Sequence, residues 1–157
     1  MTIEHDIALF ECVPALRLLG RDALRVLAIG SESRYVEDGE VLFYAGDQAD
    51  GGYIIQEGSF RLQPGGPVPA EETSAGPGTL LGELALLSAT MRSATAIARG
   101  PSAVIRISRS LFLKMLQNYP DAADKLREQI TARVTQAGKD LERVRAKLDN
   151  REAPQQG

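Results

Sequence analysis

The residues with the clearest chemical potential lie in the middle of the sequence. Six of them could together bind an anion: Gly82, Glu83, Leu84, Ala85, Arg92 and Ser93. A glycine before a short helical turn leaves free backbone N–H groups at the start of that turn, and such groups attract negative charge. Leu84 and Ala85 are the expected N–H donors, Arg92 supplies a planar cation suited to phosphate, and Glu83 can accept from a ligand hydroxyl. The pattern therefore predicts an anion-binding turn.

Catalysis and metal binding are disfavoured because the residues they need are scarce. The sequence has one histidine, His5, and one cysteine, Cys12. A metal-dependent β-barrel enzyme needs at least two imidazole or thiolate ligands on one ion, and a nucleophilic triad would have to use the terminal His5. We therefore expect no enzyme activity, no cofactor and no metal site. A cupin-like β-barrel enzyme is the alternative that metal analysis would decide.

The charge balance bears on partners and compartment. The 157 residues carry 18 lysines and arginines against 21 aspartates and glutamates, a net charge of -3. This gives no bulk attraction to nucleic acid or to an anionic membrane, so neither is expected as a partner. Glu4 and Asp6 stand where a signal peptide would be basic, and no apolar run approaches spanning length. Cys12, which cannot form an internal disulfide, is expected to be buried in a cytoplasmic protein.

The secondary structure expected around the turn changes twice along the chain, from helices to strands and back to helices. Residues 7–29 have helical apolar spacing, and Gly30 is expected to end the last of these helices in the left-handed conformation. Short β-branched and aromatic runs separated by glycines follow at residues 35–36, 40–44, 52–55, 59–62, 94–98 and 103–107. Residues 63–78 predict a long mobile loop. After Ser108 the helical period returns, with Ser110 as the expected cap.

These patterns predict a mainly β fold with flanking helices. The expected architecture is an antiparallel β-roll, a jelly-roll-like double-stranded β-helix, with short N-terminal helices and a long C-terminal helix. We assign residues 7–125 to the β-roll with its N-terminal helices, 126–150 to a C-terminal lid or dimerisation helix, and 151–157 to a disordered tail. Apolar residues from Ile130 to Leu148 alternate in steps of four and three, the spacing of one seam along a helix.

One segment carries a resemblance to a known family. The run Gly-Glu-Leu-Ala-Leu-Leu at residues 82–87, followed by Arg-Ser-Ala-Thr at 92–95, resembles the phosphate-binding cassette of cyclic-nucleotide-binding domains. Members include the catabolite activator protein, the protein kinase A regulatory subunits and cyclic-nucleotide-gated channels. The spaced glycines of residues 39–58 resemble the family's preceding two-strand run. The resemblance implies that Glu83 binds the ribose 2′-hydroxyl, Arg92 the cyclic phosphate, and Ser93 adds a hydroxyl contact.

The resemblance also implies a regulatory sensor whose C-terminal helix closes over the bound nucleotide. Thr131, Thr135 and Gln136 are the candidate contacts to the base. Cyclic AMP is the expected ligand because Ser93 follows the arginine as in the catabolite activator, and cyclic GMP is the alternative. A homodimer through the seam Ile130–Leu148 and an unidentified protein partner are further expectations.

The sequence departs from the family pattern at several positions. Met91 replaces a common proline and Ala89 a common glycine, which predicts a less rigid loop before Arg92. Gly52 stands where an aromatic or large apolar residue is usual, which predicts weaker packing beneath the glycine-rich turn of the earlier run of residues 39–58. Only seven residues follow Asn150, so a stand-alone sensor without a helix-turn-helix is expected. A β-roll interaction module that has lost the ligand is the alternative, and nucleotide titration separates the two.

Overall fold

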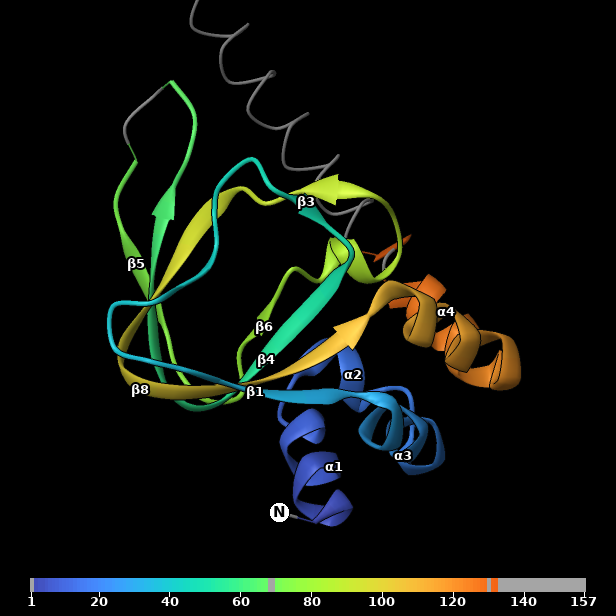
Figure 1. Cartoon of the computed structure of the whole chain (residues 1–157). Coiled ribbons are helices and arrows are strands. Elements are labelled where there is room, and N and C mark those ends of the chain that lie inside the picture. The colour runs from blue at the N-terminus through green and yellow to red at the C-terminus, as the bar shows by residue number, and fades with distance from the viewer. Residues whose placement is uncertain (1, 68–69, 130, 133–157) are drawn as a thin grey trace, which may run out of the picture.

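The computed structural model describes residues 2–67, 70–129 and 131–132 of the chain. Its elements are α1 (Ile3–Glu11), α2 (Pro14–Arg17), α3 (Arg21–Gly30), β1 (Glu32–Val36), β2 (Val41–Phe43), β3 (Gln48–Ala49), β4 (Gly51–Pro64), β5 (Thr73–Ala75), β6 (Leu80–Leu81), the 3-10 turn η1 (Leu84–Leu86), β7 (Thr90–Met91), β8 (Ala94–Ser108) and α4 (Arg109–Asn118). Residues 120–129 and 131–132 are also helical. Figure 1 shows α1 to α4 gathered at one side of a curved sheet. The predicted fold class is therefore confirmed, with a sheet that does not close.

Two long antiparallel strands, β4 and β8, form the centre of the fold. β1 and β2 pair with β8, and β5 and β6 pair with β4, which makes a six-stranded sheet; β3 and β7 form a separate two-stranded sheet. The predicted strands 52–55 and 59–62 are thus parts of one strand, and so are 94–98 and 103–107. The prediction separated the first pair at Gly58, which has φ +81° and lies in a register shift of the β4–β8 ladder. Such a bulge bends a strand without ending it.

The segment predicted as a long loop contains a strand. Thr73, Ser74 and Ala75 form β5 and pair with residues 60–62 of β4. A strand of three residues is too short to show an alternating pattern, and its polar neighbours are typical of loops. The loop prediction for residues 63–78 is therefore wrong for this part.

The long strands contribute to two apolar clusters because successive side chains in a strand point to opposite faces. Ile54 and Ile105 are buried in the first cluster, together with side chains from all four helices. Their neighbours Ile55 and Val104 are buried in the second cluster, inside the curve of the sheet. A slip of one residue would exchange the two faces, so this double burial fixes the register of the strands that carry the site.

Two expectations about the N-terminal helices are wrong. Gly30 is the last residue of α3 and has no positive φ; a Cβ there would lie 2.6 Å from Cδ1 of Leu111, so its small size serves the packing of α3 on α4. Cys12 is exposed. It caps the C-terminus of α1, and its thiol donates to the Ala8 carbonyl at 3.5 Å on the surface of that helix, while Phe10 and Val13 supply the buried side chains.

The junction between β8 and α4 differs from the prediction by two residues. The cap of α4 is Ser108, whose hydroxyl accepts from the N–H of Leu111 at 3.2 Å, while Ser110 contacts the Ser108 hydroxyl at 3.2 Å. Among the described residues, no helix is long and apolar enough to cross a membrane. The tail 151–157 and most of the helix predicted at 126–150 lie outside the described residues, so the domain boundaries stay predictions.

Candidate ligand-binding site

A pocket of about 360 Å³ opens between η1 and the link from β7 to β8. Its lining comes from strands β2, β3, β4, β6, β7 and β8 as well as from η1: Phe43, Ala49, Leu62, Leu80, Leu81, Gly82, Glu83, Leu84, Ala85, Thr90, Met91, Arg92, Ser93 and Ala94. All six residues predicted to bind the anion are in this set. The structure therefore brings together two sequence segments that the sequence only places near each other.

The turn at η1 starts from Gly82, which has φ +86°, a conformation that favours glycine. The side chain of Ala85 is fully buried, whereas that of Leu84 is 70% exposed at the rim. The Ala85 N–H, an expected ligand donor, donates to the Gly82 carbonyl at 3.1 Å. Within the described part of the chain, the N–H of Leu84 has no acceptor. In this structure the donor that remains for a ligand is thus Leu84 N–H.

Arg92 lies inside the molecule and is only 8% exposed. Its backbone is held to the turn between β2 and β3: its N–H donates to the Asp47 carbonyl at 2.8 Å, and its carbonyl accepts from Gly46 N–H at 2.8 Å. Its side chain runs inward, where Nη2 donates to the carbonyl of Gly51 at 2.8 Å. A lone arginine after a loop is usually solvated, so this inward course is the decisive geometric result.

The second terminal nitrogen of Arg92, Nη1, is buried and has no hydrogen-bond partner among the described residues. A Cβ placed on Gly82 would overlap this nitrogen. The glycine is therefore required for two reasons, its positive φ and the close approach of the guanidinium. A buried guanidinium nitrogen without an acceptor carries a free-energy cost that an anion in the pocket would remove.

The electrostatic surroundings leave the Arg92 charge incompletely neutralised. Burial is the main cause that lowers the pKa of Arg92, with Arg106 acting in the same direction and Tyr53, Asp50 and Asp47 opposing it. Asp50 is paired with Arg106 at 2.7 Å. No ion pair joins Arg92 to a carboxylate within the described residues; the Gly51 carbonyl accepts from Nη2, and two aromatic rings lie against the guanidinium. The guanidinium remains available to an incoming anion.

Glu83 and Ser93 lie at the edge of the same pocket. Glu83 also borders a neighbouring hollow formed with Val13, Pro14, Ala15 and residues 78–80. Ser93 is exposed, and its carbonyl accepts from Gly65 N–H at 3.0 Å. Both residues thus line the pocket, and their contacts to a ligand stay predictions.

Of the predicted contacts to the base, the described one, Thr131, does not line this pocket. The hydroxyl of Thr131 donates to the Arg127 carbonyl at 2.9 Å, and Thr131 lines a separate surface hollow. Thr135 and Gln136 lie outside the described residues. A base contact from this segment stays a prediction.

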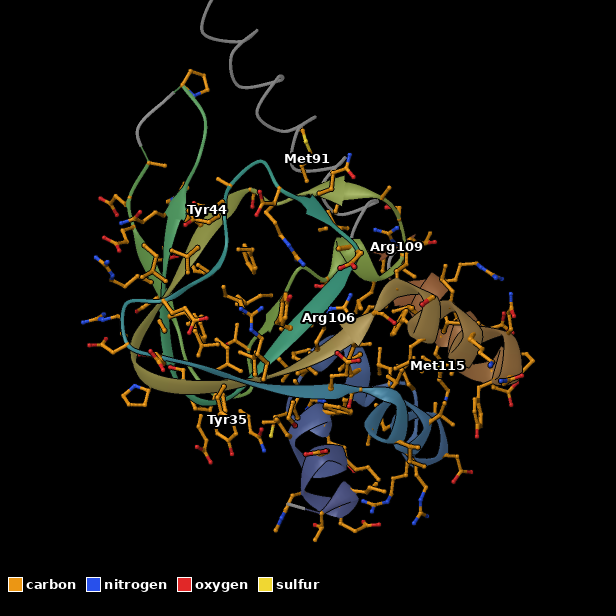
Figure 2. All side chains as sticks on the ribbon, viewed as in Figure 1. Tyr35, Tyr44, Met91, Arg106, Arg109 and Met115 are labelled. Atoms are coloured by element: carbon orange, nitrogen blue, oxygen red, sulfur yellow. The ribbon has the colours of Figure 1, made fainter. Side chains whose placement is uncertain are left out.

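Sequence reasoning missed several residues around Arg92. Phe43 and Tyr53 lie in predicted strands, but nothing in their spacing indicates that their rings meet a particular arginine. Arg109, the first residue of α4, donates from Nε to the Ala85 carbonyl at 2.9 Å and from Nη2 to the Ala49 carbonyl. Figure 2 shows Arg106 and Arg109 on either side of the β8–α4 junction. Arg109 thus links η1 to the C-terminal helices.

The predicted packing weakness at Gly52 is not a gap in the structure. A Cβ at this position would lie 3.1 Å from Cδ1 of Leu80 and 3.2 Å from the carbonyl oxygen of Leu81, so β6 occupies the space. Met91 lies in β7 and is 66% exposed, and the lower rigidity of this segment stays a prediction. Within the described residues, no group of three or more His, Cys, Asp or Glu side chains could hold a metal ion.

Comparison with known proteins identifies relatives of this chain. A family model for the cyclic nucleotide-binding domain matches residues 33–119. An NTE-family protein of Mycobacterium tuberculosis is 36% identical over 109 residues, which is 69% of this chain and 18% of that protein. The chain thus corresponds to 18% of the length of this relative.

Two solved structures extend the comparison. A cyclic nucleotide-binding-like protein from Brucella abortus has 38% identity and a TM-score of 0.62, covering 71% of this chain and 97% of that one. The regulatory domain of Toxoplasma gondii protein kinase A, crystallised with cAMP, has 25% identity and a TM-score of 0.64, covering 81% and 50%. The predicted resemblance is confirmed.

Proposed function

The chain belongs to the cyclic nucleotide-binding domain family, and from this premise we propose that it is a regulatory sensor, not an enzyme, that binds cyclic AMP in the pocket between η1 and Arg92. The observation that carries the proposal is the buried, unpaired Nη1 of Arg92, which lies against Gly82 at the start of η1. A singly charged cyclic phosphate placed there would satisfy the guanidinium and accept from Leu84 N–H.

The other pocket residues suit the remaining parts of a nucleotide. Glu83 would accept a hydrogen bond from the ribose 2′-hydroxyl, and Ser93 would donate to a phosphate oxygen. Apolar side chains of Leu62, Leu80 and Met91 line the pocket and would cover the sugar and base. A pocket of about 360 Å³ lies within the range of small-molecule sites.

Cyclic AMP is proposed over cyclic GMP on two grounds. The T. gondii regulatory domain, which is similar in structure, was crystallised with cAMP. Ser93 also follows the arginine as in the catabolite activator. A hydroxyl at this position could meet the guanine amino group, so cyclic GMP is the competitor that the titration must include.

The output is proposed to pass through α4 to the C-terminal helix. Arg109 joins the Ala85 carbonyl to the first turn of α4, so a ligand that fixes η1 also fixes this contact. Leu84 and Met91 leave an exposed apolar rim that a lid could cover. A nucleotide that binds the closed state more tightly than the open state would shift the population toward closure. Dimerisation through Ile130–Leu148 and location in the cytoplasm stay predictions.

Calorimetric titration with cyclic AMP and cyclic GMP tests the proposal. Replacing Arg92 with alanine removes a desolvated charge that would contact phosphate, which costs about 2–5 kcal/mol, or roughly 30-fold to several-thousand-fold in affinity. The domain should remain folded. Arg99→Ala is the matched control, because Arg99 is an exposed arginine of β8 outside the pocket.

A second arm examines the ribose contact. Glu83→Ala should weaken cyclic AMP binding but should have little effect on a 2′-deoxy analogue, since the analogue lacks the hydroxyl that the carboxylate would accept from. If neither nucleotide gives heat or raises the melting temperature of the wild-type chain, the domain is instead an interaction module without a ligand.

A further inference from the structure

Beside the pocket, an aromatic pair lies against the Arg92 guanidinium. Cζ of Arg92 is 4.4 Å from the centre of the Phe43 ring and 5.5 Å from that of Tyr53. The two rings stack on each other at 6.0 Å with an angle of 28° between their planes. Both distances are within the range of cation–π attraction.

The backbone of β2 explains how Phe43 reaches this position. Val41 pairs with Ile97 of β8, but Phe43 pairs with Ala96, so the register shifts by one residue between them. In a regular strand Leu42 and Phe43 would face opposite sides of the sheet. Here Leu42 is buried in the cluster inside the curve, and Phe43 packs against the same cluster and also lines the pocket. The irregularity re-aims the ring toward the arginine.

From this geometry we infer that Phe43 is a positioning residue, which holds the Arg92 guanidinium in its inward orientation before any ligand binds. The contact stabilises a positive charge that burial disfavours, as the lowered pKa of Arg92 reflects. It acts together with the hydrogen bond from Nη2 to the Gly51 carbonyl, which fixes one edge of the guanidinium.

An aromatic partner differs from a carboxylate because it leaves the N–H donors of the guanidinium free. A carboxylate would accept from the guanidinium nitrogens and would compete with an incoming phosphate for them. The face of a ring attracts the cation without accepting from its N–H groups in the guanidinium plane. Nη1 accordingly stays unpaired within the described residues, while the side chain is still held. Phe43 therefore orients the arginine for an anion without occupying any of its hydrogen-bond donors.

The consequence for binding rests on the proposed function. Without the Phe43 ring, part of the free-energy cost of orienting the Arg92 side chain would be subtracted from the free energy of ligand binding. Phe43→Leu keeps an apolar side chain but removes the π-face, and we expect cyclic AMP affinity to fall about 2- to 30-fold, the equivalent of 0.5–2 kcal/mol of cation–π attraction. Phe43→Tyr keeps the π-face, and its affinity should stay within about twofold of wild type.

The test compares both variants with Tyr35→Leu, which removes an aromatic ring that is 76% exposed on β1 and does not line the pocket (Figure 2). Calorimetry gives the affinities, and the melting temperature of each variant verifies folding. The Arg92 Nε–Hε resonance, assigned by its loss in Arg92→Lys, reports the side chain in the ligand-free protein. A guanidinium held inside the molecule is shielded from water, so Phe43→Leu should speed the exchange of this Nε proton with solvent, whereas Phe43→Tyr and Tyr35→Leu should not.

Two results would overturn the inference: an unchanged exchange rate of the Arg92 Nε proton in Phe43→Leu, or equal losses of affinity in the leucine and tyrosine variants, which would mean that side-chain fit and not the π-face matters. A wild-type chain that binds no cyclic nucleotide would remove the proposed function, yet the exchange rate of this proton in the free protein would still decide whether Phe43 positions Arg92. The two failures are therefore distinguishable.

Discussion

Replacing Gly82 with alanine should move the Arg92 guanidinium while leaving the arginine in the chain. The variant therefore tests whether the position of the guanidinium matters for binding. Gly82 has φ +86°, and an L-residue in this region costs about 1–2 kcal/mol, which lowers the melting temperature by about 2–8 °C. The added Cβ would also overlap Nη1 of Arg92. Because Nη1 is at the far end of a flexible side chain, the guanidinium should move away while the domain remains folded. We therefore expect cyclic AMP affinity to fall at least about 30-fold, as in Arg92→Ala.

Gly39→Ala provides the matched control for backbone strain. Gly39 has φ +80°, and a Cβ built there meets no atom within 4 Å. This variant should lose similar thermal stability but keep wild-type affinity. Thermal unfolding and calorimetric titration of the two variants measure the two effects separately. Wild-type affinity in Gly82→Ala would refute the idea that the glycine makes room for the guanidinium, and an equal affinity loss in both variants would attribute the effect to strain alone.

Three further substitutions test other parts of the site and its support. Arg92→Lys keeps the charge but not the planar pair of nitrogens, so nucleotide affinity measured by calorimetry should fall about tenfold or more; an unchanged affinity would mean that charge alone suffices. Gly51→Ala would drive a Cβ into the backbone of Ile107 and Ser108, so urea denaturation should show a loss of about 1–3 kcal/mol or more, and an unchanged midpoint would contradict this packing. Ser108→Ala removes the cap of α4 and should cost about 0.5–2 kcal/mol in the same assay, whereas Ser110→Ala should cost less; the reverse order would place the cap at the second serine.

The binding turn could be predicted from the sequence because its chemistry is local. Gly82 must adopt a positive φ, the residues after it form a short turn, and Arg92 follows within reach of the turn. These facts depend on residue types at short separation, and the structure places all six predicted residues around one pocket. The mainly β fold was also predictable, since β-branched runs between glycines have few other solutions.

The limits of the sequence appear where the conformation depends on distant contacts. Glycine-rich separators predicted four strands where β4 and β8 are continuous, because a bulge and a turn can use the same residue type. The exposed thiol of Cys12 and the cap at Ser108 depend on where neighbouring elements end, which tertiary packing decides. Gly30 was expected to end a helix by its φ, yet its size matters for a contact with Leu111, 81 positions along the chain.

By itself, then, the sequence determined which residues could bind an anion and which class of fold would present them, since both follow from local residue types and periodicity. Only the tertiary structure decided that the side chain of Arg92 points inward, that Gly51 and Phe43 hold it there, and that one of its nitrogens is left unpaired. Those contacts join strands that are remote in the chain, and their geometry depends on the register of β4 against β8 and on the irregularity in β2. No local pattern encodes that register, because it is set by the burial of both faces of the sheet at once.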